Sequence, residues 1–276
     1  MFVSKAEEKD FALLQEFIIP HEYLCAALSS FVRKKDSHIY YISEKTRVES
    51  VNDIKGLFYL EGSLLHCIPQ ISEELLQALI SFLKDKKVRA IDGEESVSFK
   101  IIEALGSFQK PFQINKYQLM ILKEAAKASP EELSEDDEII RCTENDIDLL
   151  FDLQKQYLLK EVAPQGKKLT DLECKMSLRQ ILKNQLVFAL FSDGELVSKA
   201  NTNAIGINYV QLGGVYTHPL YRKNYYAWNL VKLLCDRIQR TKKTPVLFVK
   251  EKNTPALSLY KAIGFSQAGN FVIAYY

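Results

Sequence analysis

Residues 213–227 read GGVYTHPLYRKNYYA, and this stretch decides the predicted fold. The pattern predicts a strand that ends at Pro219, then a short basic turn, and then a helix. Apolar residues at helical spacing continue that helix through residues 228–238. A strand that leads into such a turn aims the free N–H groups of the helix at one point, which suits a phosphate. The stretch therefore predicts a phosphate-binding turn.

The composition is that of an ordinary globular protein. The 276 residues allow one large domain or two smaller ones, and 47 % are hydrophobic and 26 % charged. Lys and Arg total 36 against 35 for Asp and Glu, which argues against nucleic-acid binding through a basic surface. No apolar run approaches the roughly 20 residues that span a bilayer, and no signal segment is recognisable. We therefore expect a cytoplasmic protein with no membrane partner.

Cysteine and histidine spacing predicts no metal site. The five cysteines are scattered, no Cys-x-x-Cys pair occurs, and none of the four histidines has a second ligand at metal-binding spacing. We expect small buried thiols rather than disulfides.

A polar, acidic segment divides the chain. Residues 124–137 contain Pro130 and several acidic residues, and they predict a linker between an N-terminal α/β domain (1–123) and a C-terminal domain (138–276). In the first domain we expect helices at 6–17, 21–33, 72–83 and 95–105, and strands at 38–42, 56–61, 64–69, 88–91 and 113–122. In the second we expect helices at 144–162, 171–184, 228–238 and from 254, and strands at 138–142, 186–191, 195–202, 208–217, 246–250 and 271–276.

The last elements of the two parts follow a similar order. Two strands, a helix, a strand, a helix and a strand close each part. This order suggests a duplication in which only the second copy keeps the phosphate turn.

A second motif follows the first along the chain. Residues 247–265 read LFVKEKNTPALSLYKAIGF, with Asn253 after a strand, Tyr260 seven residues later, and a terminal Gly-Phe. As a pair, the two motifs resemble those of the GNAT superfamily of acyl-coenzyme A-dependent N-acyltransferases. The resemblance covers about residues 138–276. It implies an α/β (α+β) fold with a mixed, mostly antiparallel sheet flanked by helices. The first domain has neither motif and compares only with a degenerate GNAT-like domain.

The resemblance also implies which residues bind acetyl-CoA, the expected co-substrate. The family pattern Gln/Arg-x-x-Gly-x-Gly/Ala falls on six residues whose backbone would hold the pyrophosphate: Arg222, Lys223, Asn224, Tyr225, Tyr226 and Ala227. The preceding strand would separate from its neighbour and pair with the pantetheine amides through the backbone of Val215, Tyr216 and Thr217. Asn253 would contact the pantetheine arm, and Tyr260 would lie near the sulfur.

The implied chemistry is attack of an amine on the thioester. A backbone N–H near Val215 would stabilise the oxyanion, and Tyr260 would protonate the leaving thiolate. Tyr260 could instead be a packing aromatic of an amphipathic helix. The sequence does not identify the general base, because the strand at 208–214 has no acidic residue. A water chain or Glu161 could act as the general base. Alternatively, Glu161 is only a solvated charge at the end of a helix.

Two further points are left open by the sequence. Tyr225 replaces the central glycine of the pattern, and we expect it to take the helical φ that tyrosine accepts, so that its N–H keeps its direction. Its side chain could still crowd the phosphate. On the strand at 195–202 and just beyond it, Asn201, Thr202 and Asn203 either contact the acceptor or face solvent.

The sequence thus predicts an N-acetyltransferase acting on a small-molecule or peptide amine. One alternative is a catalytically inactive acyl-CoA-binding or interaction module, and another is a transferase using a longer acyl-CoA or an aminoacyl-tRNA. The N-terminal domain would shape the acceptor side or the interface of a homodimer.

Overall fold

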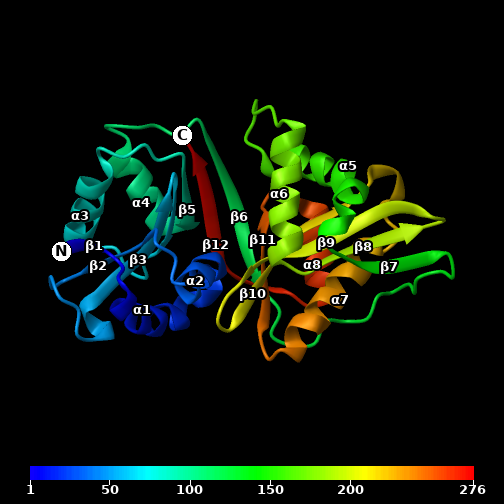
Figure 1. Ribbon diagram of the computed structural model, residues 1–276, viewed down its shortest axis with the longest axis horizontal. Coiled ribbons are helices and arrows are strands. Elements are labelled where there is room, and N and C mark those ends of the chain that lie inside the picture. The colour runs from blue at the N-terminus through cyan, green and yellow to red at the C-terminus, as the bar shows by residue number, and fades with distance from the viewer.

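Ten elements of the N-terminal half recur in the same order in the C-terminal half. The computed structural model describes residues 1–276 (Figure 1). The first ten are β1 (Phe2–Lys5), α1 (Phe11–Ile18), α2 (Ala26–Arg33), β2 (Ile39–Ser43), β3 (Ile54–Glu61), β4 (Ser63–Cys67), α3 (Glu73–Leu83), β5 (Ala90–Glu94), α4 (Glu95–Leu105) and β6 (Gln113–Ile121). The second ten are β7 (Asp137–Cys142), α5 (Ile147–Tyr157), α6 (Asp171–Asn184), β8 (Val187–Ser192), β9 (Glu195–Ile205), β10 (Tyr209–Thr217), α7 (Tyr226–Arg240), β11 (Thr244–Lys250), α8 (Thr254–Ile263) and β12 (Ser266–Tyr275).

The two halves share one sheet by exchanging their last strands. The 12 strands lie in the order β1-β2-β3-β4-β5-β12-β6-β11-β10-β9-β8-β7. Strand β6 of the first half pairs with β11, and β12 of the second half pairs with β5. Figure 1 shows β6 and β12 side by side where the halves meet. Only β4–β5 and β10–β11 are parallel, so the predicted α/β fold with a mostly antiparallel sheet is confirmed.

Each half packs one pair of helices on each face of its sheet. Leu79 of α3 and Ile101 of α4 belong to one apolar cluster of the first half, and Leu14 of α1 and Leu28 of α2 belong to another. The second half repeats this arrangement, with α5 and α6 in one cluster and α7 and α8 in the other. The expected amphipathic periodicity of the helices explains these faces.

A buried carboxylate of the first half holds a loop of the second. Glu22 is fully buried, and its side chain accepts hydrogen bonds from the backbone N–H groups of Ile207, Asn208 and Tyr209. A Cβ at Gly206 would lie 2.2 Å from Glu22 Oε1, so only glycine allows this approach. The β9–β10 loop is therefore fixed by the other half of the chain.

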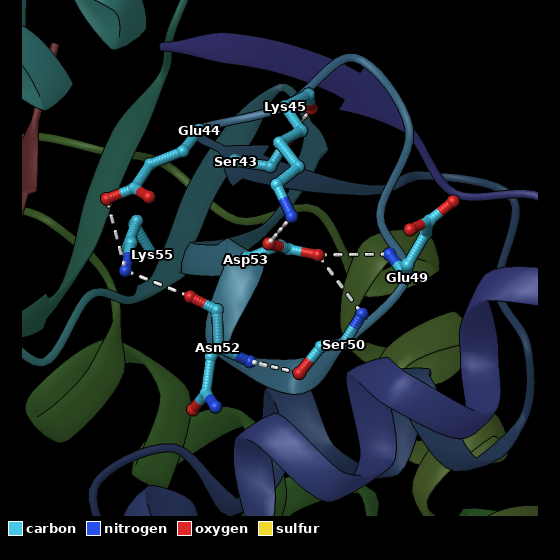
Figure 2. Close-up of polar contacts among 8 residues, drawn as sticks. All are labelled: Ser43, Glu44, Lys45, Glu49, Ser50, Asn52, Asp53 and Lys55. Carbon is cyan, nitrogen blue, oxygen red and sulfur yellow. Dashed lines mark hydrogen bonds and ion pairs between the residues drawn. The ribbon is translucent and has the colours of Figure 1, made fainter.

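The β2–β3 connection of the first half is longer than its counterpart in the second. Figure 2 shows how Asp53 organises it: its carboxylate accepts from the backbone N–H groups of Glu49 and Ser50 and pairs with Lys45 at 2.8 Å. These contacts keep the pKa of Asp53 below its usual value. The equivalent β8–β9 connection is the tight turn at Asp193-Gly194.

Several expectations at element level need correction. The helix expected at 21–33 is a 3-10 turn over Ile19–Leu24 followed by α2, and the strand expected at 271–276 begins at Ser266. Strand β1 was not expected, because its four residues are too few to show a period. Strand β5 spans residues 90–94 rather than 88–91, since Asp92, Gly93 and Glu94 pair with β12, which comes from the far end of the chain. The helix expected to run to residue 162 leaves α-helical geometry after Tyr157 and ends in a π-helical turn over residues 158–162.

The predicted linker packs against the second half. Its residues form no helix or strand before β7 begins at Asp137, yet Ala126 is buried and the indole N–H of Trp228 donates to the carbonyl of Lys127. The boundaries of the two domains stay predictions.

Candidate active site

The candidate site forms where two parallel strands separate. The pairing of β10 with β11 begins at Tyr209 opposite Thr244. It ends at Leu212 opposite Leu247. Beyond this point lies a cavity of about 800 Å³, lined by both strands and by α7, α8 and the end of α5. Unpaired strand edges at such a separation can accept an extended ligand as an added strand.

All twelve residues that the sequence assigns to catalysis or cofactor binding line this one cavity. Ten are the expected cofactor contacts, at 215–217, 222–227 and 253, and two are the expected catalytic residues, Tyr260 and Glu161. Asn201, Thr202 and Asn203, the candidate acceptor contacts, do not line it: Asn201 and Thr202 are buried, and Asn203 is exposed. The fold therefore brings together two motifs and a helix end that lie far apart in the sequence. The role of each residue remains a prediction.

The turn before α7 has a backbone that the sequence does not predict. Tyr225 has a φ of 54° and a ψ of 9°, which is left-handed rather than helical, so the expectation of a helical φ is wrong. Lys223 also has a positive φ, of 74°. The family glycine at position 225 would meet this requirement without strain, because it lacks a Cβ. The ring of Tyr225 packs edge-on against Trp228, with centroids 6.2 Å apart.

The basic side chains of the turn lie at the surface of the cavity. Arg222 and Lys223 are both exposed, and Arg222 Nε donates to the carbonyl of Thr217 over 3.2 Å. The Thr217 carbonyl, an expected pantetheine contact, therefore already has a partner within the protein. Tyr216 is buried, and its hydroxyl donates to Gln156 over 3.3 Å.

Tyr260 lies deep in the cavity, near the end of α5. Its side chain is buried and its ring contacts Phe265 edge-on at 5.8 Å. Burial, with Tyr157 and Glu161 close by, raises the pKa of Tyr260 well above its usual value. Its phenol therefore keeps its proton at neutral pH and could donate it to a leaving thiolate. Glu161 is half-buried on the π-helical turn, facing the same cavity.

Asn253 serves as the N-cap of α8. Its side-chain oxygen accepts from the backbone N–H of Ala256 over 3.2 Å, and Pro255 follows in the first turn. The carboxamide nitrogen of Asn253 has no hydrogen bond within the protein and remains able to meet a ligand.

Sequence reasoning missed three residues at this site. Tyr117 of the exchanged strand β6 and Tyr157 of α5 both line the cavity. No local pattern could find Tyr117, because its strand comes from the other half. Lys199 of β9 is buried next to the cavity wall. A single lysine in the otherwise uncharged run at 196–204 was a signal that could have found it.

The matching cleft of the N-terminal half is filled. There β4 and β5 also separate, but His66 occupies the gap: a Cβ on Gly93 would lie 2.1 Å from His66 Nε2. His66 Nε2 lies 2.8 Å from Ser98 Oγ, and burial lowers the pKa of His66 to about 4. Helix α3 also begins with Glu73 and Glu74, whose charges oppose a phosphate.

The described side chains form no cluster of three or more His, Cys, Asp or Glu that could hold a metal ion. Among the helices, none combines the length and the apolar character needed to cross a bilayer.

Comparison with known proteins supports the fold of the C-terminal half. The FR47-like protein family model matches residues 191–272, which include the turn, β11 and α8. No curated protein sequence matches the chain.

Solved structures resemble the whole chain. A Drosophila protein is similar with a TM-score of 0.72 at 13 % identity, covering 100 % of this chain and 98 % of that one. A tandem GNAT protein from the clavulanic acid biosynthesis pathway has a TM-score of 0.61 at 10 % identity, covering 99 % and 96 %. A GNAT-family acetyltransferase from Colwellia psychrerythraea has a TM-score of 0.60 at 11 % identity, covering 100 % of both chains.

These likenesses establish the fold as that of a tandem GNAT protein. The resemblance of the C-terminal half to the GNAT superfamily is confirmed, and the N-terminal half repeats the fold with its cleft filled.

Proposed function

We propose that the protein is an N-acetyltransferase that binds acetyl-CoA in the C-terminal half and transfers the acetyl group to an amine. A single observation carries the proposal: one cavity, opened by the separation of β10 and β11, gathers the predicted cofactor-binding residues of both motifs together with Tyr260. A fold alone does not establish an activity, so the argument rests on this site.

The backbone of the turn would hold the pyrophosphate. Residues 222–227 lead into α7, a 15-residue helix whose N-terminal N–H groups carry partial positive charge. Arg222 and Lys223 add two exposed cations beside it. Pantetheine would then run between β10 and β11, past Asn253, toward Tyr260.

The reaction would use proximity, an oxyanion donor and an acid. The amine attacks the thioester carbonyl, a C–N bond forms, and the C–S bond breaks as the tetrahedral intermediate collapses. A backbone N–H at Val215 would stabilise the oxyanion, and Tyr260 would give its proton to the leaving sulfur. Glu161, or water ordered beside it, would take the proton of the attacking amine. Tyr157 and Tyr117 would form the acceptor side.

Two other functions remain as outcomes of the test. A catalytically inactive module would bind coenzyme A without turnover, and the replacement of the family glycine by Tyr225 favours it. A transferase with another acyl donor would need a different occupant of the same cavity. The five cysteines are all free and buried, which supports a reducing, cytoplasmic location.

Calorimetry with coenzyme A, followed by thiol release from acetyl-CoA with a panel of amines, tests the proposal. We expect binding and release of coenzyme A with at least one amine. Binding without release from any amine would favour the inactive module. No binding at millimolar coenzyme A would contradict both CoA-based functions.

Tyr260→Phe separates acid catalysis from packing. We expect kcat to fall about 100-fold, within the range for loss of a general acid, while the Kd for coenzyme A changes less than about twofold. Tyr40→Phe, on β2 of the other half, is the matched control and should leave both unchanged. An unchanged kcat in Tyr260→Phe would exclude the acid role.

A further inference from the structure

Lys199 is the one buried lysine or arginine, and it has no acidic partner. Its side chain is 1 % exposed, and its ammonium lies 4.8 Å from the ring centre of Tyr157. It donates to the carbonyl of Gly214 over 2.9 Å and more weakly to Asn201 Oδ1 over 3.4 Å. Buried charges in proteins are normally paired, so a buried ammonium held by neutral groups calls for an explanation.

The partner of Lys199 is a bulge in the strand that lines the cavity. On β10, Gly213 pairs with Asn201 and Tyr216 pairs with Lys199, so two residues on β10 oppose one on β9. Gly214 in this bulge has a φ of 60°, and a Cβ there would lie 1.7 Å from Asn201 Oδ1. Its N–H donates to the Tyr157 hydroxyl over 3.3 Å. The bulge is thus held by side chains on two sides.

The Gly214 carbonyl and the Val215 N–H belong to one peptide group. A peptide is planar and trans, so the two point in opposite directions. Because the carbonyl points at Lys199 on β9, the Val215 N–H points away from Lys199. Val215 itself lines the cavity.

We propose that Lys199 is a positioning residue that acts through this peptide. By hydrogen bonding to the Gly214 carbonyl, its ammonium polarises the peptide and makes the Val215 N–H a stronger donor to the thioester oxyanion. Hydrogen bonds in a chain strengthen one another in this way, most of all where the dielectric constant is low. The inference rests on the proposed function, in which Val215 faces the thioester.

The effect depends on the charge of Lys199, and this gives it a pH signature. Burial lowers the pKa of Lys199 to about 7. The titratable groups that face it are Cys142 of β7 and Tyr157 of α5. Burial raises the pKa of each to about 12, so neither changes charge between pH 5.5 and 9. The polarisation should therefore be present below about pH 7 and fade above it.

Nuclear magnetic resonance of the ligand-free, full-length protein tests the polarisation directly. In protein labelled with ¹⁵N-valine, the Val215 amide is assigned from a Val215→Ile sample. We expect its ¹H and ¹⁵N shifts to titrate with a midpoint near pH 7. This titration should disappear in Lys199→Met and persist in the control Lys183→Met, which changes an exposed lysine of α6. The comparison of the two variants also shows whether the titration of the Val215 amide comes from Lys199 or from His218, which lies three residues beyond Val215.

Kinetics then test the consequence. Below pH 7 we expect Lys199→Met to lower kcat about tenfold, less than the loss of a whole oxyanion donor, with KM for acetyl-CoA within about twofold. Lys199→Gln keeps a neutral donor for the Gly214 carbonyl, and its kcat should lie between those of the wild type and Lys199→Met. If Lys199→Met failed to fold, the wild-type titration and Lys199→Gln would still decide.

A Val215 amide that does not titrate, or that titrates equally in Lys199→Met, would overturn the inference. So would a kcat in Lys199→Met equal to that of the wild type below pH 7. If the amide titrates as expected but no amine is acetylated, the proposed function fails while the coupling of Lys199 to Val215 stands.

Discussion

Tyr225 holds a backbone conformation that glycine would adopt at lower free energy. Left-handed φ costs a residue with a Cβ about 1 kcal/mol. An edge-on aromatic contact such as that of Tyr225 with Trp228 contributes a stabilisation of the same order, about 1 kcal/mol. The backbone of the turn can therefore match that of a glycine-containing turn although the residue differs.

This leads to a paired prediction for coenzyme A binding. Tyr225→Gly accepts a φ of 54°, so we expect the Kd for coenzyme A to stay within about threefold of the wild type. Tyr225→Pro cannot, since proline holds φ near −65°, and we expect binding at least about tenfold weaker. Calorimetry measures both. Equal affinity in the two variants would mean that the conformation of this residue does not matter for binding.

Lys199 should make stability depend on pH. Its pKa is about 7 in the folded protein and about 10.4 in an unfolded chain, so between these values the unfolded chain binds the extra proton. The free energy of unfolding should therefore rise with pH by up to about 1.4 kcal/mol per unit in this window. Urea denaturation at pH 7.5 and 9.5 should show a smaller rise in Lys199→Met than in Lys183→Met. Equal slopes would argue against a lowered pKa.

At the scale of elements, the N-terminus of α8 combines a structural and a binding function. Asn253 caps the helix through its oxygen, and its nitrogen is free for the ligand. Serine can cap a helix as well as asparagine does, but it lacks the amide. The two contributions can therefore be separated by substitution.

We expect Asn253→Ser to keep the free energy of unfolding within about 0.5 kcal/mol and to weaken coenzyme A binding, whereas Asn253→Ala also loses about 1 kcal/mol. Ser72→Ala removes the side-chain N-cap of α3, a helix of the other half, and should cost similar stability with unchanged affinity. Urea denaturation and calorimetry give the two quantities. Undiminished affinity in Asn253→Ser would remove this residue from the binding site.

At the scale of the whole molecule, exchange of β6 and β12 makes the two halves one unit. Each half completes the sheet of the other, and Glu22 of the first half accepts three backbone N–H groups of the second. The exchange also carries Tyr117 into the cavity of the second half. The N-terminal half thus contributes to the site although its own cleft is filled.

Loss of the Glu22 charge should weaken both halves together. Glu22→Gln would replace one accepting oxygen by an NH2 donor that faces backbone N–H groups, and we expect it to cost about 2–4 kcal/mol, as for other buried charged hydrogen bonds. Trp228, the sole tryptophan, reports on the second half, and circular dichroism reports on the whole chain. Both signals should shift to the same lower midpoint, and exposed Glu16→Gln should shift neither. A shift in circular dichroism alone would show that the halves unfold independently.

The sequence by itself determined most helices and strands, the α/β class and the two motifs, because these depend on periodicity, turn residues and spacing along the chain. It also pointed to twelve of the residues that line the cavity. Only the tertiary structure decided the exchange of β6 and β12, the register of β5, the left-handed φ of Tyr225 and the burial of Lys199. Each of these depends on partners distant in the sequence, and the free energy of a strand pairing or of a buried charge is set by those partners.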